Sequence, residues 1–180
     1  AGFSSGELNA YRYENGRSLW SDALSRTSIS TSVSALADID ADPVIADGRA
    51  YAVGQGGRMV AIELVSGQRL WEQNVAGIST PWVAGEWLFL VSDQAQLMAI
   101  ARGSGRIRWI EQLRRYRVPK KSKDPVQWVG PVLAGNRLIL ANSLGEIALV
   151  SPADGSVETV VETKQAFSLP PVVANNMLYM

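Results

Sequence analysis

Short apolar runs rich in β-branched and aromatic residues, separated by glycine turns, recur along this chain. They occupy residues 49–53, 58–64 and 68–73, then 87–91, 96–101 and 106–112, and then 137–141, 146–151 and 156–161. Such runs are typical of β-strands, and the Ser-Gly, Asn-Gly and Asp-Gly pairs are typical of hairpin turns. No segment shows a capped period of 3.6 residues. The pattern therefore predicts an all-β fold of short antiparallel strands.

The runs belong to a repeat whose columns keep a common register. A proline opens a first short strand at Pro43, Pro81, Pro131 and Pro171. Further columns are a turn glycine at Gly16, Gly67, Gly105 and Gly155 and, four residues later, Trp20, Trp71, Trp109 and Thr159. Both of these columns advance by 51, 38 and 50 residues. Four short antiparallel strands in each copy of ~40 residues describe a blade of a β-propeller.

The repeat predicts one propeller segment. Its expected parts are a half blade with a long loop at 1–42, a blade at 43–80, a blade with a basic insertion at 81–130, a blade at 131–170 and the start of a truncated blade at 171–180. Two interpretations are open: the half blades close a ring of four, or the segment is about half of a larger propeller. We favour the second, because a free half-propeller would leave strand edges open to aggregation.

The amino-acid composition excludes several kinds of catalytic site and metal site. The chain has 180 residues, with 17 basic and 17 acidic side chains and no histidine or cysteine. It therefore lacks the residues of a Ser-His-Asp or Cys-His site, a zinc finger, a His- or Cys-ligated haem and a disulfide. No apolar run reaches the ~18–20 residues that span a bilayer. The first residues do not resemble a signal peptide, which leaves a cytoplasmic protein or a targeting segment outside this chain.

The stretch from Ala61 to Trp71 (AIELVSGQRLW) resembles the quinoprotein-type, PQQ-like propeller repeat, whose pattern is Ala-x-Asp-x-x-Thr-Gly-x-x-x-Trp. The resemblance implies that the repeated tryptophan packs between neighbouring blades. A large flat side chain in every copy is well suited to fill that space. We therefore expect Trp20, Trp71 and Trp109 to be structural residues rather than platforms for a ligand.

A more specific resemblance lies in the segment from Leu36 to Val44 (LADIDADPV). It is similar to a Leu-Ser-Asp-Val-Asp-type segment of the BamB-like propeller lipoproteins of the bacterial outer-membrane β-barrel assembly machine. In that family the segment follows a long inter-blade loop, and here Pro43 stands 23 positions after Trp20, whereas Pro81 stands 10 positions after Trp71. The resemblance implies an eight-bladed ring of which this chain forms about half.

This family implies a non-enzymatic periplasmic scaffold that needs no cofactor and is held at the outer membrane by a lipid anchor outside this chain. The implied function is to dock the barrel-inserting subunit and assist outer-membrane β-barrel protein assembly, with unfolded outer-membrane proteins as further partners. The family's docking face corresponds here to Asp38 and Asp40, with Leu36 and Ile39 as neighbouring apolar contacts.

Two other functions stay open at this point: a fragment of a quinone (PQQ)-dependent dehydrogenase and a ligand-binding sensor propeller. The aspartate column of the repeat is degenerate and holds Arg12, Glu63, Ala101 and Ser151. A calcium loop at Asp38, Asp40 and Asp42 is disfavoured, because Pro43 and Arg49 stand where an EF-hand needs glycine and glutamate. We therefore expect neither a metal site nor a catalytic residue.

A second long loop follows Trp109 and carries six cations and no acid: Arg114, Arg115, Arg117, Lys120, Lys121 and Lys123. Such a patch fits an anionic lipid surface or an acidic protein, and the alternative is a mobile solvated loop. No nucleic-acid partner is expected, because a single basic loop without interleaved aromatic residues is a weak signal. A serine- and threonine-rich run at 25–34 is either an added strand for a partner's sheet edge or a flexible lead.

Overall fold

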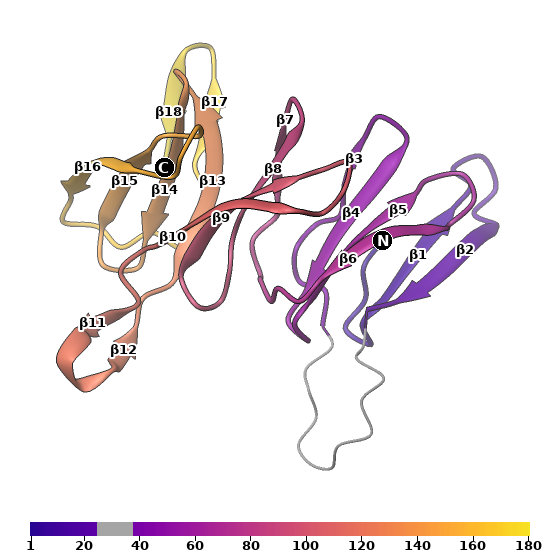
Figure 1. Ribbon diagram of the computed structural model, residues 1–180, viewed down its shortest axis with the longest axis horizontal. Coiled ribbons are helices and arrows are strands. Elements are labelled where there is room, and N and C mark those ends of the chain that lie inside the picture. Colours follow the sequence, from indigo (N-terminus) through magenta and orange to yellow (C-terminus); the bar gives the residue numbers. More distant parts are fainter. Residues whose placement is uncertain (25–37) are drawn as a thin grey trace. The chain divides into compact units, whose positions relative to one another are not determined.

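The computed structural model describes residues 1–24 and 38–180, which form antiparallel β-sheets joined by turns (Figure 1). A two-stranded sheet contains β1 (Glu7–Tyr11) and β2 (Ser18–Ala23). The first four-stranded sheet contains β3 (Val44–Ala46), β4 (Arg49–Gly54), β5 (Arg58–Glu63) and β6 (Arg69–Gln73). The second contains β7 (Trp82–Ala84), β8 (Trp87–Val91), β9 (Gln96–Ala101) and β10 (Ile107–Gln112).

The third four-stranded sheet contains β13 (Trp128–Ala134), β14 (Arg137–Asn142), β15 (Glu146–Val150) and β16 (Val157–Glu162). Two further hairpins consist of β11 (Tyr116–Val118) with β12 (Lys123–Pro125) and of β17 (Val172–Ala174) with β18 (Met177–Tyr179). The prediction of an all-β fold built from four-stranded antiparallel blades is confirmed. Within the described ranges the one helix is the short 3-10 turn η1 (Pro119–Lys121), so none is long and apolar enough to cross a membrane.

The chain divides into two compact units, each with its own apolar core. Unit 1 comprises Ala1–Pro81 with Arg102–Gly105, and unit 2 comprises Trp82–Ala101 with Arg106–Met180. The core of unit 1 includes Leu8, Leu24, Ile39, Ala52, Val60 and Ile62. The core of unit 2 joins the sheets β7–β10 and β13–β16 and includes Phe89, Leu97, Leu113, Trp128, Leu138 and Leu140.

Burial within a blade depends on the position of the strand. The second and third strands β4, β5, β8 and β9 are buried except at one or both of their end residues. A strand covered on both faces has a continuous apolar run instead of an alternating pattern. The inner strands were therefore visible in the sequence as runs such as YAV at 51–53 and LFLV at 88–91. The fourth strands are more polar, and β16 is exposed throughout.

The proline column marks strand starts in three copies but not in the fourth. β3, β7 and β17 begin directly after Pro43, Pro81 and Pro171. β13 begins three residues before Pro131, and the register with β14 shifts between Val129 and Val132 around a cis Gly130–Pro131 bond. The expectation that each proline opens its strand is thus wrong for Pro131. A proline has no N–H for the ladder and is tolerated inside a strand at such a bulge.

Three tryptophans link successive repeats through hydrogen bonds. In each case the indole Nε1 donates to a backbone carbonyl of the following copy. The pairs are Trp20 with Leu64 (2.8 Å), Trp71 with Arg102 (2.9 Å) and Trp109 with Pro152 (3.2 Å). The three rings are partly buried. Each expected tryptophan thus has a structural partner within the fold.

The turn glycines lie directly against these rings. A Cβ atom would lie 2.5 Å from Trp20 Cγ at Gly67, 2.7 Å from Trp71 Cδ2 at Gly105, and 2.6 Å from Trp109 Cε3 at Gly155. The three glycines also have positive φ angles, between +72° and +81°. Both the space and the backbone therefore favour glycine. The two sequence columns are the two halves of one contact between repeats, which we call the Trp–Gly contact.

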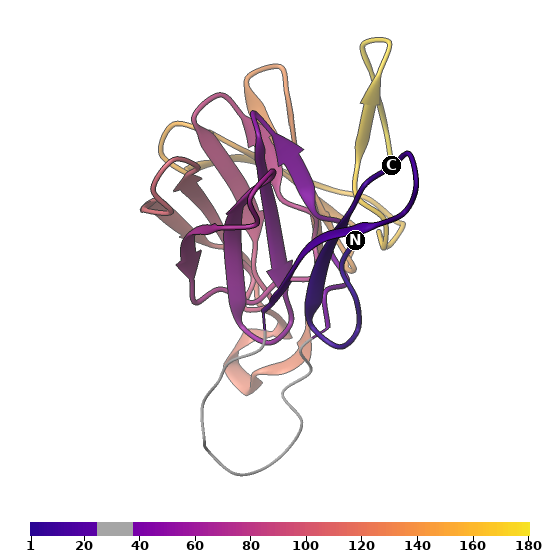
Figure 2. The ribbon, with the colours of Figure 1, turned by 90° about the vertical axis from the view of Figure 1, so that its right-hand side faces the viewer.

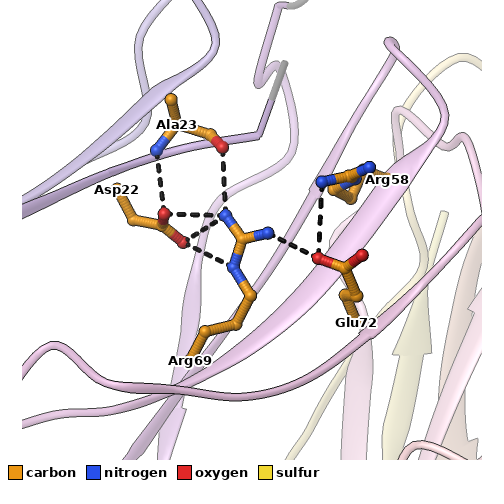
Figure 3. Close-up of polar contacts among 5 residues, drawn as sticks. All are labelled: Asp22, Ala23, Arg58, Arg69 and Glu72. Atoms are coloured by element: carbon orange, nitrogen blue, oxygen red, sulfur yellow. Dashed lines mark hydrogen bonds and ion pairs between the residues drawn. The ribbon is translucent and has the colours of Figure 1, made fainter. Parts of the chain in front are cut away.

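A bidentate ion pair also joins β2 to β6 (Figure 3). Arg69 Nη2 donates to both carboxylate oxygens of Asp22 (2.7 and 2.8 Å) and to the carbonyl of Ala23 (3.0 Å). Glu72 accepts hydrogen bonds from Arg69 and from Arg58, the latter at 3.3 Å. The hydrogen bonds that Arg69 donates to Asp22 outweigh the loss of solvent and raise the pKa of Arg69 above its ordinary value. The guanidinium therefore stays charged.

We expect Arg69→Lys to lower the free energy of unfolding by about 1 kcal/mol, because lysine keeps the charge but cannot form the fork-shaped contact. The matched control is Arg137→Lys, whose pair with Glu158 is more exposed (51% and 37%, against 27% and 21% for Arg69 and Asp22). An exposed pair of this kind contributes about 0.5 kcal/mol or less. Urea unfolding followed by circular dichroism would measure both variants, and equal losses would contradict the prediction.

Candidate functional site: the acidic segment before β3

The acidic segment, residues 38–42, leads into β3, and three hydrogen bonds hold its backbone. The N–H of Gln55, in the turn between β4 and β5, donates to the carbonyl of Asp38 (2.8 Å). The N–H of Ile39 donates to the carbonyl of Phe3, near the N-terminus (3.3 Å). The N–H of Asp42 donates to Thr80 Oγ1 (3.2 Å). Three separate parts of unit 1 therefore fix this backbone.

The side chain of Ile39 points into the protein. It is 6% exposed and packs in the core of unit 1 with Leu8 and Leu24. The backbone approaches it so closely that a Cβ at Gly2 would lie 2.5 Å from Ile39 Cγ2. The sequence suggested Ile39 as an apolar contact for a partner, but the structure makes it the internal anchor of the segment. Burial of this side chain removes apolar surface from water.

The carboxylates on either side of Ile39 have a different environment. Asp40 is exposed and accepts a hydrogen bond from Gln55 Nε2, and Asp38 is partly exposed. Partial loss of solvent, followed by the charge and a hydrogen bond of Asp40, raises the pKa of Asp38 above its ordinary value. Among the described residues no basic side chain forms an ion pair with either carboxylate. Two like charges therefore lie together without compensation inside the unit.

The raised pKa of Asp38 predicts that the stability of the folded chain falls as pH rises. A raised pKa in the folded state means that the folded chain binds this proton more tightly than the unfolded chain, so ionisation of Asp38 opposes folding from the ordinary carboxyl pKa upward to the raised one. We expect Asp38→Asn to be at least as stable as the parent at neutral pH and equally stable in acid, where Asp38 is protonated. Urea unfolding at both pH values is the measurement.

The matched control for this prediction is Asp154→Asn. Hydrogen bonds from the backbone and hydroxyl of Ser156 lower the pKa of Asp154. The sign is therefore reversed: Asp154 contributes stability above the ordinary carboxyl pKa and loses that contribution as pH falls. A loss of stability in Asp38→Asn at neutral pH, of the kind expected for Asp154→Asn, would contradict the effect assigned to the pair.

Two predictions fall on residues 25–37, which lie outside the described residues. The first is that Leu36 is an apolar contact for a partner. The second is that the serine- and threonine-rich run at 25–34 is either an added strand for a partner's sheet edge or a flexible lead. Both stay predictions.

Most of the basic run lies in an antiparallel hairpin, residues 116–125, instead of an irregular loop. β11 pairs with β12 through Tyr116 with Pro125 and Val118 with Lys123, and η1 makes the turn. Arg114 lies at the base of this hairpin, where it forms an ion pair with Glu146. Sequence reasoning missed the two strands because no alternation of apolar and polar residues marks them.

The family model described as "Outer membrane protein assembly factor BamB" matches residues 1–111, which is more than half of the chain. The chain belongs to the BamB family. BamB of Escherichia coli strain K12 is 26% identical over 178 residues, which cover 98% of this chain and 43% of that protein. The chain spans less than half the length of the curated BamB relatives that it matches along most of its length. The predicted BamB-like, PQQ-like repeat resemblance is confirmed.

Solved structures support the fold of this BamB-family chain. The crystal structure of BamB from Moraxella catarrhalis matches with a TM-score of 0.78 and 18% identity, over 99% of this chain and 49% of that one. Quinohemoprotein alcohol dehydrogenase from Comamonas testosteroni matches with a TM-score of 0.54 and 17% identity, over 68% of this chain and 21% of that one. At these identities both likenesses show a shared fold alone.

Within the described part of this BamB-family chain, no three acidic side chains come together in a way that could hold a metal ion. Asp38, Asp40 and Asp42 therefore do not form a ligand cluster, although their spacing in the sequence invited that comparison. The arrangement offers charged groups at fixed positions, which is what recognition of a partner requires.

Proposed function

We propose that this chain is part of a non-enzymatic periplasmic scaffold, peripheral to the outer membrane, that docks the barrel-inserting subunit of the assembly machine. The observation that carries the proposal is the uncompensated carboxylate pair Asp38 and Asp40, presented on a backbone that Ile39 and Gln55 hold in place. The name of the family, outer membrane protein assembly factor, supports a role in assembly. Unfolded outer-membrane proteins are further partners in this proposal.

A carboxylate pair of this kind is suited to bind arginine or lysine side chains of a partner. A partner cation would relieve the repulsion between Asp38 and Asp40 and form charge-assisted hydrogen bonds with them. The cost of ordering the segment is small, since hydrogen bonds and the buried Ile39 already fix it. The paired charges would act chiefly on the association rate and on the choice of partner.

The experiment is a binding titration of the chain with the isolated periplasmic domains of the barrel-inserting subunit. The variant Asp38→Asn/Asp40→Asn keeps the shape of both side chains, and we expect it to weaken binding by about tenfold or more. The matched control is Glu86→Gln/Asp93→Asn, which removes two exposed acids of unit 2 and the same net charge. Circular dichroism would show that both variants are folded.

Two results would count against the docking proposal. Equal weakening in the two variants would assign the effect to net charge instead of to the acidic segment. No binding by the folded chain would turn attention to the open alternatives, a quinone-dependent dehydrogenase fragment or a ligand-binding sensor propeller. Binding of the quinone PQQ to the chain, measured by calorimetry, would then distinguish these two.

A further inference from the structure

A basic hairpin, residues 115–125, extends from unit 2. It consists of Arg115 followed by β11, η1 and β12. In both views it reaches beyond the ends of the sheets β7–β10 and β13–β16 (Figure 1, Figure 2). Its exposed cations are Arg115, Arg117, Lys120, Lys121 and Lys123. With Asp124 as its one acid, the hairpin has a net charge of +4, whereas the other residues of the chain carry −4.

The base of the hairpin is anchored by Arg114. Its guanidinium donates to Glu146 Oε1 and to the carbonyls of Tyr116 (3.3 Å) and Arg117 (3.0 Å). Glu146 is 8% exposed and also accepts from the fully buried Asn142 (2.7 Å). The sixth cation of the basic run therefore serves the fold and holds the hairpin against the sheet β13–β16. The other five cations do not take part in this anchoring.

The tip of the hairpin combines these cations with exposed apolar atoms. Val118 is 38% exposed, and the exposed Pro119 and Lys120 follow it. In the part of the chain that the structure describes, no acidic side chain forms an ion pair with any of the five cations. A protruding basic end with a small apolar tip is complementary to a layer of anionic groups over an apolar layer.

We propose that this hairpin contacts an anionic phospholipid surface. The cations would lie at the headgroup phosphates, and Val118 would lie at the boundary with the acyl chains. This interaction is separate from the Asp38–Asp40 segment, so the inference does not depend on the docking proposal.

Other anionic partners fit the hairpin less well. The cavity at its base, about 210 Å³, is lined by Glu146 and Glu162 but also by Arg114 and Arg117, so its charges balance and it offers no basic groove for an acidic peptide. The one aromatic ring of the hairpin, Tyr116, is covered by the guanidinium of Arg115 at 5.2 Å and offers no free platform for a nucleobase. A flat anionic surface needs neither a groove nor a stacking platform.

The expected effect is large enough to measure. Each lysine or arginine close to an anionic membrane changes the partition coefficient by about fivefold, so three lysines together account for about a hundredfold at low salt. Salt screens charges over distances of about 10 Å at 0.1 M, so binding should weaken steeply as salt is added.

The test is co-sedimentation of the chain with vesicles of phosphatidylglycerol and phosphatidylethanolamine at low salt. The hairpin variant is Lys120→Gln/Lys121→Gln/Lys123→Gln. The matched control is Arg12→Gln/Arg17→Gln/Lys164→Gln, which removes three exposed cations outside the hairpin. We expect the hairpin variant to bind about a hundredfold less at low salt and the control to change by less than about threefold. Phosphatidylcholine vesicles should bind none of the three proteins.

Three results would overturn the inference: equal losses in the two variants, no binding of the chain to anionic vesicles, and binding to polyglutamate that exceeds vesicle binding and depends on the same lysines. The last result would assign the hairpin to an acidic protein. The variant Asp38→Asn/Asp40→Asn should still bind vesicles, so failure of the docking proposal and failure of this inference give different results.

Discussion

Replacing Trp71 with alanine should lower the free energy of unfolding by about 3 kcal/mol, through the lost packing and the cavity that is left behind. The ring of Trp71 lies 6.1 Å from that of Tyr51, between centroids, and against Gly105, and its Nε1 donates to the carbonyl of Arg102. A glycine has no side chain that could move into the vacated space. The loss should therefore fall at the large end for a single substitution.

Two further variants separate the parts of this effect. Trp71→Phe keeps a ring against Gly105 but removes the hydrogen bond, and it should cost about 1 kcal/mol. Trp82→Ala removes a more exposed tryptophan (37%) and should cost about 1 kcal/mol as well. Urea unfolding followed by circular dichroism would compare the three. If Trp71→Ala cost no more than Trp82→Ala, the Trp–Gly contact would contribute no more to the free energy of unfolding than a tryptophan outside such a contact.

Replacing Gly105 with alanine should lower the free energy of unfolding by about 2–4 kcal/mol, from strain and overpacking together. The new Cβ would lie 2.7 Å from Trp71 Cδ2 and 2.8 Å from Trp71 Cε3, which are atoms of a rigid ring. The backbone φ of +72° adds a cost of its own for a residue with a side chain.

The matched control is Gly85→Ala. Gly85 also has a positive φ, +54°, but no atom lies within 4 Å of the Cβ position, so only the backbone cost of about 1 kcal/mol applies. The double variant Trp71→Ala/Gly105→Ala should be more stable than the sum of its single changes, because the cavity accepts the added methyl group. Thermal unfolding monitored by calorimetry would test both points, and strict additivity would argue against direct contact.

The strands were predictable because their environment is simple. Inner strands such as β4 and β8 are covered on both faces, which leaves an apolar run in the sequence, and glycine turns mark their ends. The hairpin β11–β12 was not predictable, because its residues are exposed and no hydrophobic pattern records the pairing. Pro131 was misleading for a related reason: a register shift depends on the facing strand β14 and not on the local sequence.

The candidate site was predictable only in part. Spacing and resemblance pointed to Asp38 and Asp40, but alternation alone could not tell whether Ile39 faces a partner or the core. Its environment is set by Leu8 and Leu24, which lie far away in the sequence. Similarly, Arg114 looked like one more member of a basic run until its ion pair with Glu146 across unit 2 became visible. Tertiary contacts decide the role of such residues.

The Trp–Gly contact determines where repeats could be exchanged between related chains. Each contact takes its tryptophan from one copy and its glycine from the next, as Trp71 and Gly105 do. A chimera cut at the prolines would therefore assemble every new junction from two different parents. A module that runs from a tryptophan to the following glycine, such as residues 71–105, would inherit a complete junction from a single parent. Recombination points within a repeat should thus be tolerated better than points at blade boundaries.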